Sequence, residues 1–217
     1  MILAIDQSYS GTGVAYISKD GRIESGLIKT RSDMPWETRI DFILDSLNRF
    51  FDLSAITMTN PSPVQYVVLE SYAYGTSNSM IFQLGELGGN IKYNFHKKGV
   101  DAVSMLIAYP KMYMARNGQA DKAQVINGLM NRFGIRESND NVADAISIGL
   151  TYRAWLRWKE TKDIGNSYDN TLMIKVDTYL NGIRKDYKKQ RTGRLIAEGT
   201  EDPCEGSSGE GYFGLAL

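Results

Sequence analysis

Apolar positions follow two different spacings along about the first 160 residues of the chain. Short apolar runs predict five strands, which lie at 2–6, 14–18, 22–29, 66–70 and 101–108. Apolar residues three or four positions apart predict helices that begin near Pro35 and cover 78–98, 122–133 and 142–159. Three strands followed by alternating helices and strands indicate an α/β fold, here a mixed five-stranded sheet with helices on both faces.

The helix predicted over 78–98 contains three glycines, Gly85, Gly88 and Gly89. Glycine weakens a helix by about 1 kcal/mol per residue relative to alanine. Close packing against a neighbour is therefore the expected role of these positions. The same helix is a candidate contact surface between two copies of the chain.

Patterning and charge divide the 217 residues into three predicted parts. A domain over 1–160 is followed by a basic helical extension over 161–194 and by an acidic, Gly/Ser-rich tail over 195–217, which is expected to be mobile. The basic extension is either a surface for a polyanion or a helix that only packs on the core. The formal net charge of the whole chain is zero, so it argues neither for nor against a nucleic acid.

The sequence contains one cysteine, Cys204, which excludes a disulfide framework or a cysteine-rich zinc site within one chain. No apolar run is long enough to cross a bilayer, and the chain begins directly with a predicted strand. A cytoplasmic protein without a membrane partner is therefore expected.

Three acidic residues stand at informative positions. Asp6 and Glu70 each close an apolar strand, and Asp144 lies in the helix predicted over 142–159. A carboxylate at the end of a buried strand is costly unless a cation or a hydrogen-bond network receives it. Three such groups together would make an oxygen-rich site suited to Mg²⁺ or Mn²⁺. Sites of this kind support metal-dependent cleavage of phosphodiesters.

Four segments of the chain resemble RuvC-type Holliday junction resolvases, which belong to the ribonuclease H-like superfamily. The segments are ILAIDQS at 2–8 with TG at 12–13, VVLESY at 67–72, YPK at 109–111 with GQADKAQV at 118–125, and VADA at 142–145. They occur in the order in which the family has them, and the resemblance covers roughly residues 1–157.

The resemblance implies a ribonuclease H-like fold and an endonuclease that resolves four-way junctions and other branched DNA. It also implies two Mg²⁺ ions per active site, replaceable by Mn²⁺, with Asp6 contacting both ions while Glu70 and Asp144 hold one each. Symmetric cutting of a junction implies a homodimer. The compact chain and its departures from the cellular pattern fit a phage-encoded member.

One position departs from the family pattern. The family's usual additional ligand, three residues before its last Asp, falls on Asn141, whereas Asp140 lies four residues before Asp144 on the same helical face. Either Asp140 takes this role, or Asn141 takes it weakly through its amide oxygen, or Asn141 is an engineered replacement that silences cleavage. Alternatively, Ser138, Asn139 and Asp140 only cap the helix.

Further residues are expected to contact DNA. Lys122 is predicted to stabilise the charge that develops in the transition state, and Lys111 either shares this role or is an ordinary solvated lysine. Tyr72 or Tyr74 is expected to stack on a base, because the family's usual aromatic position is an alanine in this chain; either tyrosine could instead belong to the core. Ser8, in the turn after Asp6, completes the predicted DNA-binding set.

Other functions stay open from the sequence. The segment over 6–13 also resembles the first phosphate loop of actin-like and sugar-kinase-like phosphotransferases, but the chain shows no second copy of that domain. A branched-DNA-binding protein that has lost cleavage, a flap nuclease and a ribonuclease H acting on RNA–DNA hybrids are further alternatives. His96, the only histidine, is expected to be a surface or packing residue and not a metal ligand.

Overall fold

The computed structural model of this protein describes the backbone of residues 1–56, 64–71 and 78–198, together with the side chains in those ranges except at 51–56, 78–80 and 183–198. The chain divides into two compact units, Met1–Leu180 and Asn181–Leu217. The whole sheet lies in the first unit, whereas the second begins inside the last helix.

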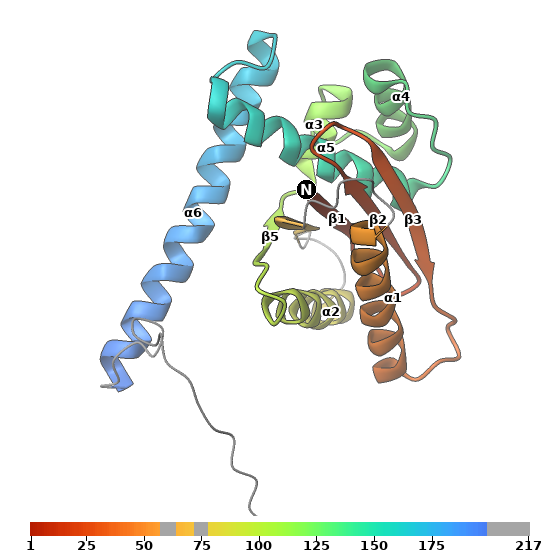
Figure 1. Cartoon of the computed structure of the whole chain (residues 1–217), viewed down its shortest axis with the longest axis vertical. Helices are drawn as coiled ribbons and strands as arrows, with labels where there is room; N and C mark the ends of the chain where they lie inside the picture. The colour runs from red at the N-terminus through yellow and green to blue at the C-terminus, as the bar shows by residue number, and fades with distance from the viewer. Residues whose placement is uncertain (57–63, 72–77, 199–217) are drawn as a thin grey trace, which may run out of the picture. The chain divides into compact units, whose positions relative to one another are not determined.

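Strands and helices follow one another along the described chain in the order seen in Figure 1. The strands are β1 (Ile2–Asp6), β2 (Gly11–Ile17), β3 (Ile23–Lys29), β4 (Tyr66–Glu70) and β5 (Ala102–Met105). The helices are α1 (Trp36–Ile56), α2 (Asn78–His96), α3 (Ala108–Ala115), α4 (Lys122–Phe133), α5 (Asp140–Thr161) and α6 (Ser167–Glu198). Among these described helices, none has both the length and the apolar character needed to span a membrane.

The strands form one mixed sheet in the order β3-β2-β1-β4-β5. Strand β2 runs antiparallel to both of its neighbours, β1 and β3, whereas β1, β4 and β5 run parallel to one another. Helices α1 and α2 cover one face of the sheet and α5 covers the other (Figure 1). The predicted five-stranded mixed sheet with helices on both faces is confirmed.

The largest difference from the predicted elements lies after β5. The strand expected over 101–108 ends at Met105, and the helix α3 follows, which the sequence did not predict. A proline just after an apolar run is also compatible with the end of a strand. Pro110 lies instead in the first turn of α3, where a missing backbone N–H leaves no helical hydrogen bond unmade.

The predicted part boundaries fall within helices. Residue 160 precedes the last residue of α5, and residue 194 lies inside α6. The division into a domain, a basic extension and a tail stays a prediction, and most of the tail lies outside the described residues.

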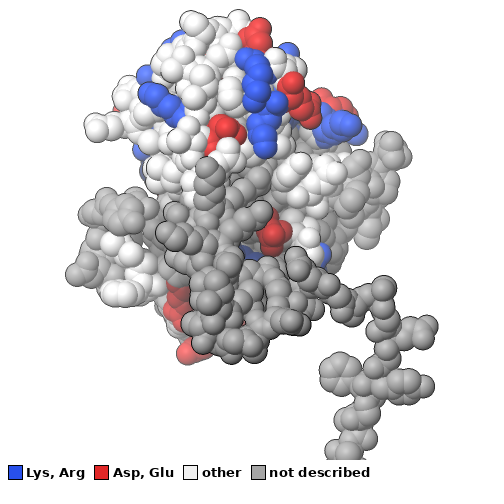
Figure 2. Space-filling model, turned by 90° about the vertical axis from the view of Figure 1, so that its left-hand side faces the viewer, with Lys and Arg blue, Asp and Glu red and all other residues white. Residues whose placement is uncertain are grey.

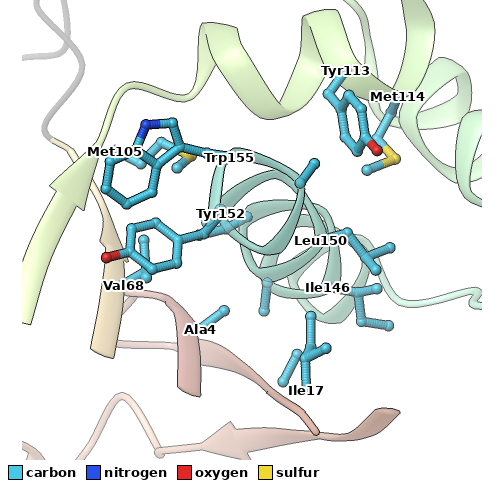
Figure 3. Close-up of a cluster of buried hydrophobic side chains, with 14 of the residues drawn as sticks. Ala4, Ile17, Val68, Met105, Tyr113, Met114, Ile146, Leu150, Tyr152 and Trp155 are labelled. Atoms are coloured by element: carbon cyan, nitrogen blue, oxygen red, sulfur yellow. The ribbon is translucent and has the colours of Figure 1, made fainter. Parts of the chain in front are cut away.

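Alternation along β1 sends its side chains to the two faces of the sheet in turn. Leu3 and Ile5 pack in the core under α1 and α2, whereas Ile2 and Ala4 pack in the core under α5. Figure 3 shows Ala4, Ile17 and Val68 below the α5 side chains Ile146, Leu150 and Tyr152. Because side chains alternate with a period of two, Asp6 should face α5 as Ala4 does.

Helix α5 lies very close to the sheet at two glycines. A Cβ atom placed on Gly13 would be 2.0 Å from the backbone oxygen of Asn141, and one placed on Gly149 would be 2.5 Å from Cδ1 of Ile17. Real Cβ atoms do not make contacts this short. At Gly13 the obstacle is the backbone of α5, so a larger residue there would displace the helix, whereas at Gly149 the nearest atom is the end of the Ile17 side chain. Gly13 therefore sets the distance of α5 from β2.

The first part of α6 belongs to the core of the first unit. Its apolar side chains Leu172, Met173 and Val176 are buried in the same cluster as α5. At the start of α6, the buried Asp169 accepts hydrogen bonds from Arg132 at 2.6 Å and from Asn166 at 2.7 Å. This part of the predicted extension therefore packs on the core.

Candidate active site

The carboxyl groups of Asp6 and Glu70 lie side by side at the end of the sheet. They close the neighbouring parallel strands β1 and β4, in which Ile5 is paired with Leu69. Asp6 lies two residues after Ala4, and Glu70 lies two residues after Val68. Ala4 and Val68 both pack on the α5 side of the sheet, so both carboxyl groups face α5. The two side chains are within hydrogen-bonding range of each other.

Asp6 is buried, and it forms no ion pair with the lysines and arginines that the structure describes. Only 7% of the residue is exposed, and burial raises the pKa of its carboxyl group well above the usual value. The hydrogen bond and charge of Glu70 raise this pKa further, as does the charge of Asp144, while Lys122 lowers it. Asp6, Glu70 and Asp144 are therefore close enough to repel one another when ionised.

Asp144 reaches the same site from the second turn of α5. Burial raises the pKa of its carboxyl group from 3.8 to about 6, and the charge of Glu70 adds to this effect. Lys111 on α3 and Lys122 at the start of α4 act in the opposite direction. The structure thus brings together the three predicted carboxylates and both predicted lysines.

Asn139, Asp140 and Asn141 make different contacts at the start of α5, where the sequence left capping and metal binding open as their roles. Asn139 is the N-cap residue, and its side chain accepts a hydrogen bond from the backbone N–H of Val142 at 3.1 Å. Asp140 forms an ion pair with Lys122. The side-chain amide of Asn141 donates a hydrogen bond to the backbone oxygen of Gly11 at 2.8 Å. Asp140 is thus engaged by a lysine and Asn141 by strand β2.

The remaining predicted residues are placed unevenly. Ser8 is half-buried, and its backbone N–H and oxygen both bond to the hydroxyl of Thr12, which holds the turn between β1 and β2. Tyr72 and Tyr74 lie outside the described residues. His96 is exposed on α2 and contacts Asp101, away from the carboxylates, in keeping with the expected surface role.

The sequence analysis missed one residue that supports the site. Gln7 is buried, and its side-chain amide donates a hydrogen bond to the backbone oxygen of Glu70 at 3.1 Å. This bond joins the ends of β1 and β4 directly beside the two carboxyl groups. A polar residue immediately after Asp6 is the only sequence signal for it, and many turn residues give the same signal.

A family model described as "Crossover junction endodeoxyribonuclease RuvC" matches residues 2–152. The chain belongs to the RuvC family. A curated relative from Corynebacterium jeikeium (strain K411), "Crossover junction endodeoxyribonuclease RuvC", is 26% identical over 129 residues, which cover 58% of this chain and 74% of the relative. The chain is accordingly an enzyme of the RuvC class, a crossover junction endodeoxyribonuclease.

Two solved RuvC structures from Thermus thermophilus share the fold. The first has a TM-score of 0.56 at 20% identity and covers 73% of this chain and 96% of its own. The second, titled as a complex with Holliday junction substrate, has a TM-score of 0.58 at 18% identity, and the match covers 72% of this chain and 94% of that structure's chain. These similarities identify the sheet and its helices as the RuvC, ribonuclease H-like fold.

The donor set fits the divalent cations on which RuvC chemistry depends. Carboxylate oxygens are hard ligands, and a cation would relieve the repulsion that raises the pKa of Asp6. Within the described residues, no three His, Cys, Asp or Glu side chains already form a ligand set. Asp6 and Glu70 lie close together, and a cation would supply the positive charge that these carboxyl groups lack.

Proposed function

We propose that this RuvC-family protein is a Mg²⁺-dependent, structure-selective endodeoxyribonuclease that hydrolyses phosphodiester bonds in Holliday junctions and other branched DNA. The observation that carries the proposal is the position of Asp6, which is buried next to Glu70 and Asp144. A buried acid among other acids is strongly unfavourable for the fold alone, and such groups are concentrated at functional sites.

The residues take distinct roles in the proposed reaction. Asp6, Glu70 and Asp144 would hold the cations, which when bound activate a water molecule and stabilise the charge on the phosphate. Asp140 and Asn141 are the candidates to complete this set, as the sequence suggested. Asn141 donates to the Gly11 carbonyl through its amide nitrogen, so its amide oxygen could still serve as a ligand, whereas the Oδ2 atom of Asp140 is paired with Lys122.

Lys122 and Lys111 would stabilise the substrate phosphate. Both ammonium groups act electrostatically on Asp144, so both are close to the carboxylates. Lys122 exposes 71% of its side chain although it pairs with Asp140, and it is therefore accessible to DNA. A preorganised cation near the reacting phosphate is most useful where negative charge increases in the transition state.

The distribution of surface charge favours DNA binding through a few local contacts rather than through a broad basic surface. On the side of the molecule in Figure 2, Lys and Arg side chains are interspersed with Asp and Glu over the described surface. The formal net charge of the chain is also zero. DNA binding is therefore proposed to depend on the lysines near the carboxylates and on bound cations.

The alternatives differ in what they require of the chain. An actin-like phosphotransferase needs a second domain of the same fold, but the described residues contain one five-stranded sheet. A binding protein without cleavage would need no cation site, whereas the mutual electrostatic influence of Asp6, Glu70 and Asp144 supports one. A ribonuclease H would prefer RNA–DNA hybrids as substrates. A cleavage assay with both substrates distinguishes this activity from junction cleavage.

A cleavage assay tests the proposal directly. Labelled four-way, three-way, flap and RNA–DNA hybrid substrates would each be incubated with the protein and either Mg²⁺, Mn²⁺ or Ca²⁺. We expect paired cuts in the four-way junction with Mg²⁺ and Mn²⁺, and binding without cutting with Ca²⁺. Hydrolysis of ATP without junction cutting, or cutting of the hybrid alone, would contradict the proposal.

A homodimer is part of the same proposal, and α2 is its proposed contact surface. Phe82 and Tyr93 expose 78% and 63% of their surfaces on this helix, and Gly85 and Gly89 lie between them at helical spacing. Nothing in the described chain lies within 4 Å of a Cβ placed on either glycine. The close packing that these glycines allow is thus proposed to be with a second copy.

The dimer surface is tested by comparing two exposed phenylalanines. Phe82→Asp should yield monomers by light scattering and should replace paired junction cuts by single nicks. Phe42→Asp is the matched control, because Phe42 is 45% exposed on α1. A Phe82→Asp protein that stays dimeric, or equal effects of the two variants, would refute this surface.

A further inference from the structure

A second concave surface lies at the opposite end of β1 from Asp6. It has a volume of about 590 Å³ and is lined by residues at the starts of β1 and β4, in the turn after β2 and in the second half of α5. Tyr113 on α3, Phe133 at the end of α4 and Ile164 between α5 and α6 complete the wall. No carboxylate of the active site lines this hollow, which we call the basal hollow.

The basal hollow carries an excess of positive charge. Lys19, Arg153 and Arg157 line it together with one acid, Glu160. All three basic residues are exposed, and none of them belongs to an ion pair within the described residues. A second acid, Asp163, is in electrostatic range of Arg157, which still leaves three positive groups against two negative ones.

Two of these guanidinium groups act on a group in the wall. Burial raises the pKa of the Tyr113 hydroxyl, and Arg153 and Arg157 are among the groups that lower it. Arg153 is also held in place from outside, because it donates a hydrogen bond to the backbone oxygen of Lys19 at 3.4 Å and lies against Gly21. The two guanidinium groups thus lie near the wall of the hollow, and Arg153 is in contact with the turn after β2.

Apart from Ser18 and Gln65, the rest of the lining is apolar or aromatic. Tyr66 and Leu150 lie beside the buried core, and Phe133 remains 37% exposed although it is a large apolar side chain. Aromatic faces stack on nucleobases, and guanidinium groups bind phosphate oxygens through paired hydrogen bonds. The basal hollow therefore offers both kinds of contact within one concave surface.

We propose that the basal hollow binds a nucleoside phosphate, with its phosphates against Arg153 and Arg157 and its base against the aromatic wall. The volume of the hollow lies in the range of about 300 to 1,000 Å³ that is typical of small-molecule sites. A concave surface of this size suits a small ligand better than a DNA duplex, which presents a convex backbone. This site is separate from the proposed nuclease chemistry and does not depend on it.

Calorimetric titration of the full chain with ADP tests this site. The titration would be made in EDTA, so that no cation links the ligand to the active-site carboxylates, and adenosine and inorganic phosphate would be titrated in parallel. We expect saturable binding of ADP, and binding about tenfold or more weaker for either fragment, because each makes only one kind of contact.

Variants locate the binding. Arg153→Gln and Arg157→Gln should each weaken ADP binding about tenfold or more, since each loses a charged hydrogen-bond donor to the phosphates. Phe133→Ser should weaken ADP binding while leaving inorganic phosphate binding unchanged. Arg31→Gln is the matched control, because Arg31 is exposed elsewhere and its change alters the net charge equally. Circular dichroism would establish that each variant is folded.

Three results would overturn the proposal. The first is the absence of saturable ADP binding by the wild-type protein. The second is ADP binding that survives both Arg153→Gln and Arg157→Gln, because the ligand would then lie elsewhere. The third is failure of ADP to bind while a duplex oligonucleotide does so with the same dependence on the two arginines, which would assign the basal hollow to DNA.

Discussion

Two buried carboxyl groups in this protein have opposite surroundings. Asp169, 2% exposed, receives hydrogen bonds from the guanidinium of Arg132 and the amide of Asn166. Asp6, 7% exposed, faces Glu70 and Asp144. One acid is thus compensated by its own fold, and the other is surrounded by further acids.

The difference shows how burial can serve either stability or function. At Asp169 the guanidinium of Arg132 and the amide of Asn166 both donate to Oδ2, and this ion pair joins the start of α6 to α4. A buried acid among acids opposes folding, and it is retained where a ligand supplies the missing charge. Substitutions at the two sites should therefore have effects of opposite sign on stability.

The largest expected effect is the loss of cleavage in Asp6→Asn. The amide cannot replace the carboxylate as an anionic ligand, and junction cleavage with Mg²⁺ should fall about a thousandfold or more, equivalent to about 4 kcal/mol. The variant should also unfold at a higher temperature than the wild type in EDTA at pH 8. Single-turnover cleavage and thermal unfolding measure the two quantities. Cleavage within tenfold of wild type would remove Asp6 from the active site.

The second effect is the loss of stability in Arg132→Ala, which leaves Asp169 buried without its cation. Breaking a buried pair in this way should lower the free energy of unfolding by about 3 to 5 kcal/mol. Urea unfolding measures it. Arg31→Ala, which breaks an exposed pair with Asp33, should change stability little. If both substitutions lowered the free energy of unfolding equally, the buried Arg132–Asp169 pair would contribute no more to stability than an exposed pair.

A smaller effect is expected from Lys122→Ala. Removing this ammonium group should slow junction cleavage about 10- to 100-fold, because the developing charge on the phosphate loses a stabilising cation. Lys122→Arg, which retains the charge, should recover part of the rate. The pH at which cleavage is half-maximal should also rise, since Lys122 lowers the pKa of both Asp6 and Asp144. An unchanged rate in Lys122→Ala would make Lys122 a surface lysine.

Asp144→Asn should change stability in a pH-dependent way. The folded protein raises the pKa of Asp144 from 3.8 to about 6, so the folded state binds this proton more tightly than the unfolded chain. The resulting destabilisation is absent below the lower pKa, develops between the two values and is complete above the higher one. The metal-free variant should be more stable than wild type by about 1 to 3 kcal/mol at pH 8.

The same comparison at low pH is the internal control for Asp144. Near pH 4 the wild-type carboxyl is largely protonated in the folded protein, so the stability difference from Asp144→Asn should nearly vanish. Urea unfolding in EDTA at the two pH values measures this change. A difference that does not depend on pH would mean that Asp144 does not titrate as its surroundings indicate.

The smallest effect concerns Asn141→Asp, which restores the family's usual acidic residue. A carboxylate cannot donate the hydrogen bond that Gly11 now receives, so the metal-free protein should lose about 1 kcal/mol of stability. Mg²⁺ should offset this loss if the new carboxylate becomes a ligand. A metal-free variant as stable as the wild type would show that the bond to Gly11 contributes little.

Much of the fold could be predicted because the sequence patterns are local. The apolar run before Asp6 and the spacing in α4 each identify their element without reference to the rest of the chain. Helix α3 could not be predicted in this way, because Pro110 is compatible with a strand end as well as with a first helical turn.

The site could be predicted in outline but not in its contacts. The positions of Asp6 and Glu70 at strand ends suggested that they meet, and the parallel pairing of β1 and β4 explains why they do. That Asp140 pairs with Lys122, or that Asn141 bonds to Gly11, depends on distances between elements far apart in sequence. Spacing within a single helix carries no information about such distances.

The contact between Gly13 and Asn141 also limits how this enzyme can be altered. A methyl group at position 13 would collide with the backbone of α5 and move Asp144 together with the rest of that helix. Libraries aimed at new substrate preference should therefore leave β2 unchanged and vary α4, whose outer surface around Lys122 is exposed and can accept diversity without shifting the reactive groups.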